Sequence, residues 1–340
     1  MVRRIAITLG DVAGIGPEVI VRAWSRAPAS LVVVGHPEIL RRAIQLVGAD
    51  LEVREVDDLR FPGAEASSIP CWNPAGDDAA DVPPGQNDRR AGRAAYEYLC
   101  AATRAALAGT VDAIVTAPLS KAALHLAGLK YPGHTEILAE LCQTPDHGMM
   151  LYLPDTGSRG LGVIHTTLHT SIQSVPDLLT TPLIVDKIRL IDGFLKTVDC
   201  ANPRIAVCAL NPHAGEEGLF GNEEFRTIAP AVRAAAGEGI TVVGPLPADA
   251  LFKRAFAGEF DGVVAMYHDQ GHIALKLMGF DRAVNVTLGL PIVRTSPSHG
   301  TAFDIAWKGI ARPEGMIEAI RVARTLAQKK PTGNALASNV

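Results

Sequence analysis

The chain has 340 residues, a length that suits two domains of about 150 residues each. Apolar residues make up 48% of it and charged residues 20%, the balance of an ordinary globular protein. The formal net charge is −4 and no dense cationic run occurs, which excludes sequence-independent binding to nucleic acid. No stretch approaches about 18 uninterrupted apolar residues, so we expect no transmembrane helix and no membrane partner.

The start of the chain and the cysteines both indicate the cytoplasm. The apolar stretch near Met1 is interrupted by Asp11 and several glycines, so it makes a poor signal peptide. The five cysteines are scattered and include no CxxC pair, which is typical of reduced thiols. We therefore expect a soluble cytoplasmic protein.

Short β-branched runs alternate along the chain with alanine-rich stretches of helical pattern. The runs that predict buried strands cover residues 5–9, 31–34, 113–116, 162–165, 205–209, 241–243 and 262–266. The clearest helical patterns cover residues 91–108 and 222–236, and a glycine follows each of them. This alternation predicts an α/β fold with a largely parallel, helix-covered sheet. Active sites in such folds lie in the loops after the carboxyl ends of the strands.

Three segments are expected to lie outside the regular strands and helices. Residues 61–87 are rich in Pro, Gly and Asp and are predicted to form a loop or a weak hairpin. The tail after Lys329 is expected to fray. The glycine-rich turn 10–18 matches neither the dinucleotide fingerprint nor a Walker loop, so we expect it to lead into a helix near Pro17.

Three of the predicted strand-end loops carry a histidine: His169, His213 and His268. Imidazole is a common ligand of zinc-like ions, and three protein ligands leave one position open for substrate. A lone histidine is more often a structural hydrogen-bonding residue. The residues alone therefore leave a metal site and a structural role both open.

Two further features indicate an anion site. Thr135, in the sequence GHTE, is predicted to cap a helix whose N-terminus would face an anion, with a plain helix start as the alternative. Arg294 ends the apolar run 290–294, where an unpaired charge would be costly, so an anionic partner is expected.

Seven motifs together resemble the 4-hydroxythreonine-4-phosphate dehydrogenase (PdxA) family of vitamin B6 synthesis. They lie between about Ile5 and Ala327 and read GDVAGIGPE, TAPLSK, GHTE, LNPHAGE, MYHDQG, NVTLGLP and HGTA. The resemblance implies the α/β fold of isocitrate and isopropylmalate dehydrogenases, with two domains around mostly parallel sheets and a cleft between them. It implies a cofactor-side domain of residues 1–130 with 285–340, and a metal, substrate and dimer domain of residues 131–284.

The resemblance also assigns roles to residues, position by position. The implied ligands of one divalent ion (zinc, magnesium, cobalt or manganese) are His169, His213 and His268. The implied substrate-binding residues are His134, Thr135, Lys276, Asn285 and Arg294. The implied NAD or NADP contacts are His299, Gly300, Thr301, Ala302 and Asp304, although Phe303 and Trp307 depart from the related signature HGSAPDIAG.

The implied assembly is a homodimer with a shared active site. The candidates for the proton acceptor are Asp269, Asp249 and Lys121. Asp269 could equally orient the neighbouring histidine as a metal ligand.

Segments around His125, His272 and Trp307 look closest to the family branch that acts on D-threonate or D-erythronate 4-phosphate. The implied reaction is an NAD(P)-dependent oxidative decarboxylation that gives dihydroxyacetone phosphate and CO2. The alternative is 4-hydroxythreonine-4-phosphate dehydrogenation in pyridoxal phosphate synthesis, which gives 3-amino-2-oxopropyl phosphate. The GHTE motif argues against the related terephthalate dihydrodiol dehydrogenases. A zinc hydrolase and a non-catalytic phosphometabolite-binding protein remain as rivals from other classes.

Overall fold

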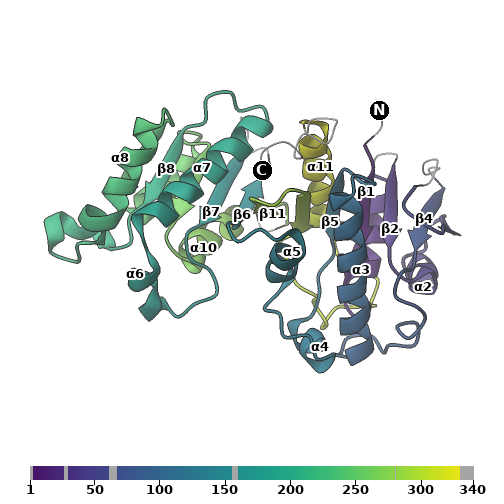
Figure 1. Ribbon diagram of the computed structural model, residues 1–340. Helices are drawn as coiled ribbons and strands as arrows, with labels where there is room; N and C mark the ends of the chain where they lie inside the picture. The colour runs from purple at the N-terminus through teal and green to yellow at the C-terminus, as the bar shows by residue number, and fades with distance from the viewer. Residues whose placement is uncertain (1–2, 27–29, 61–66, 155–159, 280, 330–340) are drawn as a thin grey trace. The chain divides into compact units, whose positions relative to one another are not determined.

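The computed structural model describes residues 3–26, 30–60, 67–154, 160–279 and 281–329 (Figure 1). The chain divides into two compact units, residues 1–143 with 291–340 and residues 144–290. Compared with the division expected from the sequence, helix 134–142 lies in the first unit and strand 284–288 lies in the second.

The first unit is a wholly parallel sheet with helices on it. Its strands run in the order β3-β4-β2-β1-β5-β12, and every pairing between neighbours is parallel. The strands are β1 (Ile5–Thr8), β2 (Leu31–Val34), β3 (Glu52–Glu55), β4 (Ser68–Trp72), β5 (Ala113–Thr116) and β12 (Val293–Pro297). The helices are α1 (Gly16–Trp24), α2 (Pro37–Val47), α3 (Arg89–Leu107), α4 (Lys121–Leu126), α5 (His134–Cys142) and α11 (Glu314–Lys329).

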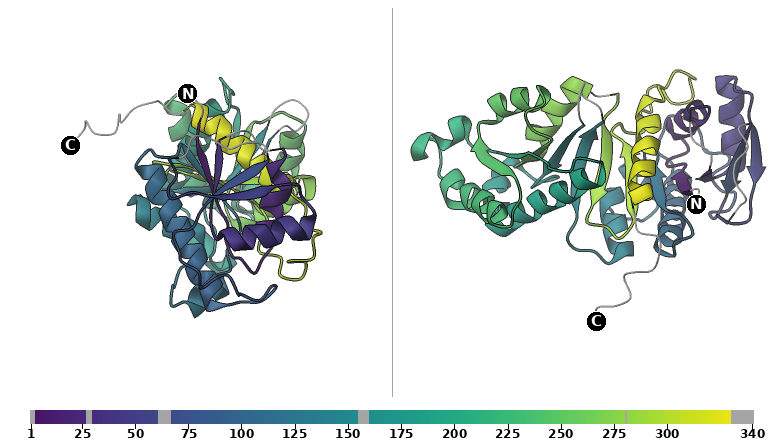
Figure 2. Two further views of the ribbon diagram at one scale, coloured as in Figure 1. Left: turned by 90° about the vertical axis from the view of Figure 1, so that its right-hand side faces the viewer. Right: turned by 90° about the horizontal axis from the view of Figure 1, so that it is seen from above.

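Helices cover both faces of this sheet. Strands β1, β2 and β5 are buried along their whole length, as short β-branched runs in a parallel sheet should be. Helix α3 packs on β1 and β5, while α11 packs on β5 and β12 from the other side (Figure 2). The carboxyl ends of β5 and β12 are therefore neighbours, and the loops that follow them can share a site.

The second unit has a mixed sheet. Its strands run in the order β11-β6-β7-β10-β8-β9; β6 is antiparallel to both neighbours, and the other pairings are parallel. The strands are β6 (Gly148–Leu153), β7 (Leu161–His165), β8 (Ile205–Cys208), β9 (Val242–Leu246), β10 (Gly262–Ala265) and β11 (Val284–Leu288). The helical elements are η1 (Ile172–Ser174), α6 (Val175–Leu178), α7 (Thr181–Thr197), η2 (Pro212–Gly218), η3 (Glu224–Ile228), α8 (Ala229–Gly237), α9 (Ala248–Phe256) and α10 (His268–Gly279).

The core of the second unit lies between this sheet and α9 and α10. Val163 and Val263, from adjacent strands, pack there with Phe252 and Leu275 from the two helices. On the opposite side, α7 contacts β7 and β10. Within the part of the chain that the structure describes, none of the helices combines the length and apolar character that a bilayer span requires.

The α/β class and the parallel strands expected from β-branched runs are confirmed. The expectation for residues 61–87 was wrong in part, because Ser68–Trp72 forms strand β4, parallel to β3 and β2. Its Ile69 and Cys71 are buried. The strand was not predicted because Pro70 and the surrounding Pro and Gly residues are typical of loops. Residues 61–66 and the tail from 330 lie outside the described residues. Helix 222–236 proves to be a π-turn, η3, that continues into α8.

Candidate functional site

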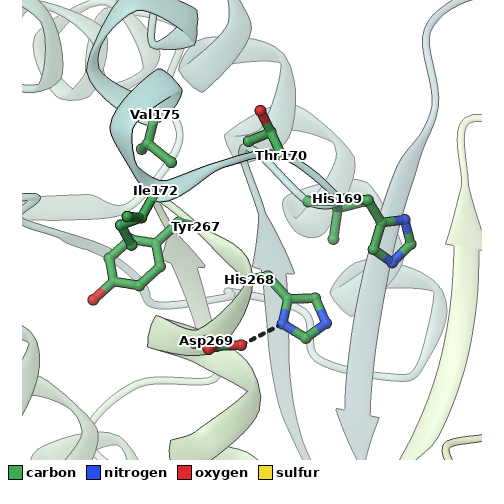
Figure 3. Close-up of a pocket in the computed structure, with 8 residues that line it drawn as sticks. His169, Thr170, Ile172, Val175, Tyr267, His268 and Asp269 are labelled. Atoms are coloured by element: carbon green, nitrogen blue, oxygen red, sulfur yellow. Dashed lines mark hydrogen bonds and ion pairs between the residues drawn. The ribbon is translucent and has the colours of Figure 1, made fainter.

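Two of the predicted metal ligands lie at one pocket in the second unit. Strands β7 and β10 are parallel neighbours, so the segments after them emerge side by side. The pocket has a volume of about 310 Å³ and is lined by Leu168, His169, Thr170, Ile172, Val175, Tyr267, His268 and Asp269 (Figure 3). The ring centroids of His169 and His268 are 5.9 Å apart.

This pair has the chemistry and nearly the spacing of two ligands on one ion. With metal–nitrogen bonds of about 2.0–2.1 Å and tetrahedral angles, two imidazole centroids lie about 5 Å apart. His268 Nδ1 is 2.6 Å from Asp269 Oδ1. A carboxylate only accepts hydrogen bonds, so Nδ1 carries the proton and Nε2 keeps its lone pair. His268 is therefore held in the tautomer that binds a metal through Nε2.

His213 lies on η2, directly after β8, which is the neighbour of β10 in the sheet. The three predicted histidines thus follow three adjacent parallel strands. Residues 213–217 all have left-handed backbone angles, with φ between 43° and 80°. The His213 ring is exposed, and its nearest aromatic neighbour is Phe220, at 6.2 Å between centroids.

The structure therefore brings His169 and His268 together but does not bring His213 to them. Among the described residues, no group of three or more His, Cys, Asp or Glu side chains is arranged to hold an ion. The segment that carries His213 is anchored by the buried Glu224. Its Oε1 accepts hydrogen bonds from the backbone N–H groups of Leu210, at 2.8 Å, and Asn211, at 2.7 Å.

Two histidines without an assigned role lie behind His268. The His272 ring stacks on the His268 ring, with centroids 3.8 Å apart and planes at 11°. His272 Nδ1 is 3.0 Å from Nε2 of His165, which ends β7. Burial is the main cause that lowers the pKa of His165 to about 4 and that of His272 to about 2. Repulsion from His165, His268 and Lys276 lowers the pKa of His272 further.

The predicted substrate residues of the second unit lie on α10 and β11. Lys276 is partly buried on α10, one turn after His272. Asn285 lies on β11 opposite Leu151 of β6. The buried Oδ1 of Asn285 has no hydrogen-bond partner among the described residues, so its acceptor capacity is available to a ligand.

Arg294 is the largest nearly inaccessible side chain of the first unit, at 2% exposure. It lies on β12, and its Nε and Nη2 donate to Thr116 Oγ1 of β5, at 3.2 and 2.7 Å. Burial lowers the pKa of the guanidinium to about 9, so it is still largely protonated at neutral pH. Arg294 is the second residue of β12, but its guanidinium reaches Thr116 at the carboxyl end of β5, where a buried cation is suited to binding an anion.

His134 lies close to the same strand end. Burial, followed by the charge of Arg294, holds the pKa of His134 well below its ordinary value, and its ring bonds to the Ala117 backbone. His134 is the first residue of α5 and Gly133 is its N-cap. Thr135 therefore lies within the first turn, and the expectation that it caps the helix was wrong. A capping residue must precede the first helical position.

The residues expected to contact the nicotinamide cofactor form a loop after β12 in the first unit. This loop packs on the glycine-rich turn after β1, because Ile15 N–H donates to the Thr301 carbonyl oxygen at 3.0 Å. A side chain at Gly14 would come within 2.9 Å of that oxygen, which explains the glycine. Trp307 Nε1 donates to the Val12 carbonyl oxygen at 2.9 Å, so the departure at Trp307 serves this packing.

The structure separates the three candidates for the proton acceptor. Asp269 is bonded to His268, as described above. Asp249 is exposed on α9, which follows the edge strand β9 and not the strands that carry His169 and His268. Lys121 begins α4 in the first unit, and its Cε would lie 3.9 Å from a methyl group added to Gly133. Lys121 thus lies beside the turn that carries His134.

Sequence reasoning missed the partners of these residues. Thr116 belongs to the quoted motif TAPLSK, yet its bond to Arg294 spans 178 positions. The bond between His165 and His272 spans 107 positions. A polar residue at the last position of a predicted strand was the available signal for Thr116 and His165, because strand ends form the sites of parallel sheets.

Comparison with known proteins shows the family to which the chain belongs. Residues 27–323 match the family described as pyridoxal phosphate biosynthetic protein PdxA. D-threonate 4-phosphate dehydrogenase of Salmonella typhimurium is 47% identical over 335 residues, 96% of this chain and 99% of that protein. 4-Hydroxythreonine-4-phosphate dehydrogenase of Geobacter metallireducens is 46% identical over 334 residues, 97% of each. The crystal structure of 4-hydroxythreonine-4-phosphate dehydrogenase from Klebsiella pneumoniae superposes with a TM-score of 0.85 at 47% identity, covering 96% of this chain and 99% of that one.

The α/β sheets, the polar strand ends and these relatives define an enzyme, a dehydrogenase that acts on a CH–OH group. The expectation of a dehydrogenase is confirmed. The relatives favour this class over the two rival classes, a zinc hydrolase and a non-catalytic binding protein. The chain belongs to the PdxA family.

Proposed function

We propose that the chain oxidises and decarboxylates D-threonate 4-phosphate or D-erythronate 4-phosphate, with NAD or NADP as the oxidant and a divalent metal ion. The observation that carries the proposal is the buried Arg294, joined to Thr116 and close to His134 at one strand end. Several relatives named D-threonate 4-phosphate dehydrogenase, at 44–47% identity, support the choice of substrate.

In this proposal Arg294 binds one anionic end of the substrate, its carboxylate or its phosphate. A guanidinium forms paired hydrogen bonds with either group, and burial strengthens them because no water competes. His134 and Thr135 lie in the first turn of α5, where backbone N–H groups also favour an anion. Lys276 and Asn285 are the other two proposed substrate-binding residues.

His169, His213 and His268 are the proposed metal ligands. When bound, the ion would act as a Lewis acid at the substrate hydroxyl and at the oxygen that gains charge as CO2 leaves. Asp269 holds the proton on His268 Nδ1, so we assign it an orienting role. Lys121, beside Gly133, is the candidate that we favour for accepting the hydroxyl proton.

The loop of His299, Gly300, Thr301, Ala302 and Asp304 is proposed to contact the nicotinamide cofactor. We also propose a homodimer with a shared active site. Ile273, Leu277 and Met278 are exposed on α10 at 58%, 81% and 58%, next to Lys276, and a second copy would cover them. The five cysteines are scattered along the sequence without a CxxC pair, which supports a cytoplasmic location.

The second candidate is 4-hydroxythreonine-4-phosphate dehydrogenation, which the Geobacter metallireducens relative favours at 46% identity. The two substrates differ at C2, which carries a hydroxyl in one and an ammonium in the other. A buried ammonium requires a carboxylate or several acceptors. None of the proposed substrate-binding side chains is acidic, which is compatible with the hydroxyl substrate.

Steady-state assays with D-threonate 4-phosphate, D-erythronate 4-phosphate and 4-phosphohydroxy-L-threonine test this choice. We expect one of the sugar-acid phosphates to give at least about a tenfold higher kcat/KM, a gap of about 1.4 kcal/mol in transition-state stabilisation. A higher kcat/KM for the amino substrate would assign the chain to pyridoxal phosphate synthesis instead.

A further inference from the structure

The rings of His165, His272 and His268 form a continuous series that runs from the core of the second unit to the pocket in Figure 3. His268 and His272 are one helical turn apart on α10, so their rings lie on the same face of the helix. Their stacking is close, with centroids 3.8 Å apart. His165 comes from β7 and is 1% exposed.

The hydrogen bonds in this series have defined directions. His165 Nδ1 lies 3.4 Å from the Met149 carbonyl oxygen, which only accepts, so Nδ1 carries the proton of the neutral ring. Nε2 of His165 is then an acceptor for the His272 Nδ1–H across 3.0 Å, and the His272 ring also bonds to the His268 backbone. His272 is thereby fixed in both its tautomer and its ring plane.

The packing around His165 and His272 restricts the orientation of the His272 ring. His272 is 8% exposed, so its ring has little room to rotate. A side chain at position 271 would come within 2.6 Å of His165 Nε2. Gly271 therefore leaves the space through which His165 reaches α10.

We infer that His272 is a positioning residue that fixes the plane of the His268 ring, and that His165 fixes His272 in turn. The inference rests on the proposed role of His268 as a metal ligand. His268 is held at its edge by Asp269 and on its face by His272. A ligand that is already oriented loses less side-chain freedom when the metal binds, so the metal binds more tightly.

The test is calorimetric titration of the full-length, metal-stripped protein with Co2+ alone. The key variant is His272→Asn, whose amide can still donate to His165 but has no ring to stack on His268. The matched control is His125→Asn, an exposed histidine on α4 of the first unit. We expect His272→Asn to weaken Co2+ binding by about tenfold and to alter the visible spectrum of the bound Co2+. The control should match the wild type, and thermal unfolding without metal should show that each variant is folded.

The outcomes distinguish this inference from the proposed function. If the wild-type chain binds no Co2+, the metal proposal is contradicted and the positioning role with it. If the wild type binds Co2+ and His272→Asn binds it equally well with the same spectrum, the positioning role alone is refuted.

A second measurement needs no variant. Nitrogen NMR of 15N-histidine-labelled wild-type protein should show His272 as the Nδ1–H tautomer. Detection of the Nε2–H tautomer would overturn the arrangement.

Discussion

Replacing Arg294 with methionine is expected to lower kcat/KM by about two orders of magnitude while leaving stability nearly unchanged. Charge-assisted hydrogen bonds at a buried site are worth about 1.5–3 kcal/mol, and each 1.4 kcal/mol is about tenfold in rate. Arg294 is 2% exposed, so solvent does not screen its bond to an anion. Methionine is flexible and can fill much of the same space, and exchanging a buried charge for an apolar side chain is often neutral.

The assay is the initial rate of NAD(P) reduction at several substrate concentrations, with thermal unfolding measured on the same preparations. Arg321→Met is the matched control, because Arg321 is about half exposed on α11 and pairs only locally with Glu318. The control should change neither quantity. A kcat/KM within about threefold of the wild type for Arg294→Met, or an equal loss in both variants, would show that Arg294 has a structural role.

Two further predictions concern the metal and a buried acid. Chelation followed by desalting should abolish NAD(P) reduction and added divalent metal should restore it, with little change in melting temperature; full activity in a preparation shown metal-free by elemental analysis would contradict the metal site. Burial, with repulsion from Asp88, raises the pKa of Asp11 from its ordinary 3.8 to about 6, so its contribution to stability is present below about pH 4 and is lost as pH rises through 6. Asp11→Asn keeps an acceptor for the Ala13 N–H, so the wild type should lose roughly 2 to 3 kcal/mol of unfolding free energy relative to this variant between pH 4 and 7. Parallel pH profiles in urea denaturation would refute that assignment.

The sequence predicted seven strands, β1, β2, β5, β7, β8, β9 and β10, because β-branched runs have few alternatives in a buried parallel sheet. It missed β3, β11 and β12, although β11 (Val284–Leu288) is rich in β-branched residues. It did not predict β6, whose Gly148–Leu153 contains Met, Leu and Tyr but no β-branched residue. It also concealed β4, in which Pro70 stands between two buried residues. The hydrophobic periodicity and the composition of a segment identify a strand only where the β-propensity of its residues agrees with their tertiary environment.

The positions of the site residues were predictable, but their partners were not. Histidines after predicted strands indicated the carboxyl edge of a sheet, and the strand order β7-β10-β8 agrees with that. The left-handed run that carries His213 depends on the buried carboxylate of Glu224, a tertiary interaction with no sequence pattern. The stack of His272 on His268 follows from helical spacing, but its bond to His165 depends on how α10 packs on β7.

In the proposed function, hydride transfer is coupled to the loss of the substrate carboxylate. The most direct measurement incubates the purified enzyme with NAD or NADP, a divalent metal and D-threonate 4-phosphate labelled at its carboxyl carbon. Reduced nicotinamide and labelled CO2 should then appear together in equal amounts, and neither should appear without the metal. Reduced nicotinamide without labelled CO2, in a product that keeps its carboxylate, would contradict the decarboxylation, and the absence of both with all three candidate substrates would contradict the proposed function.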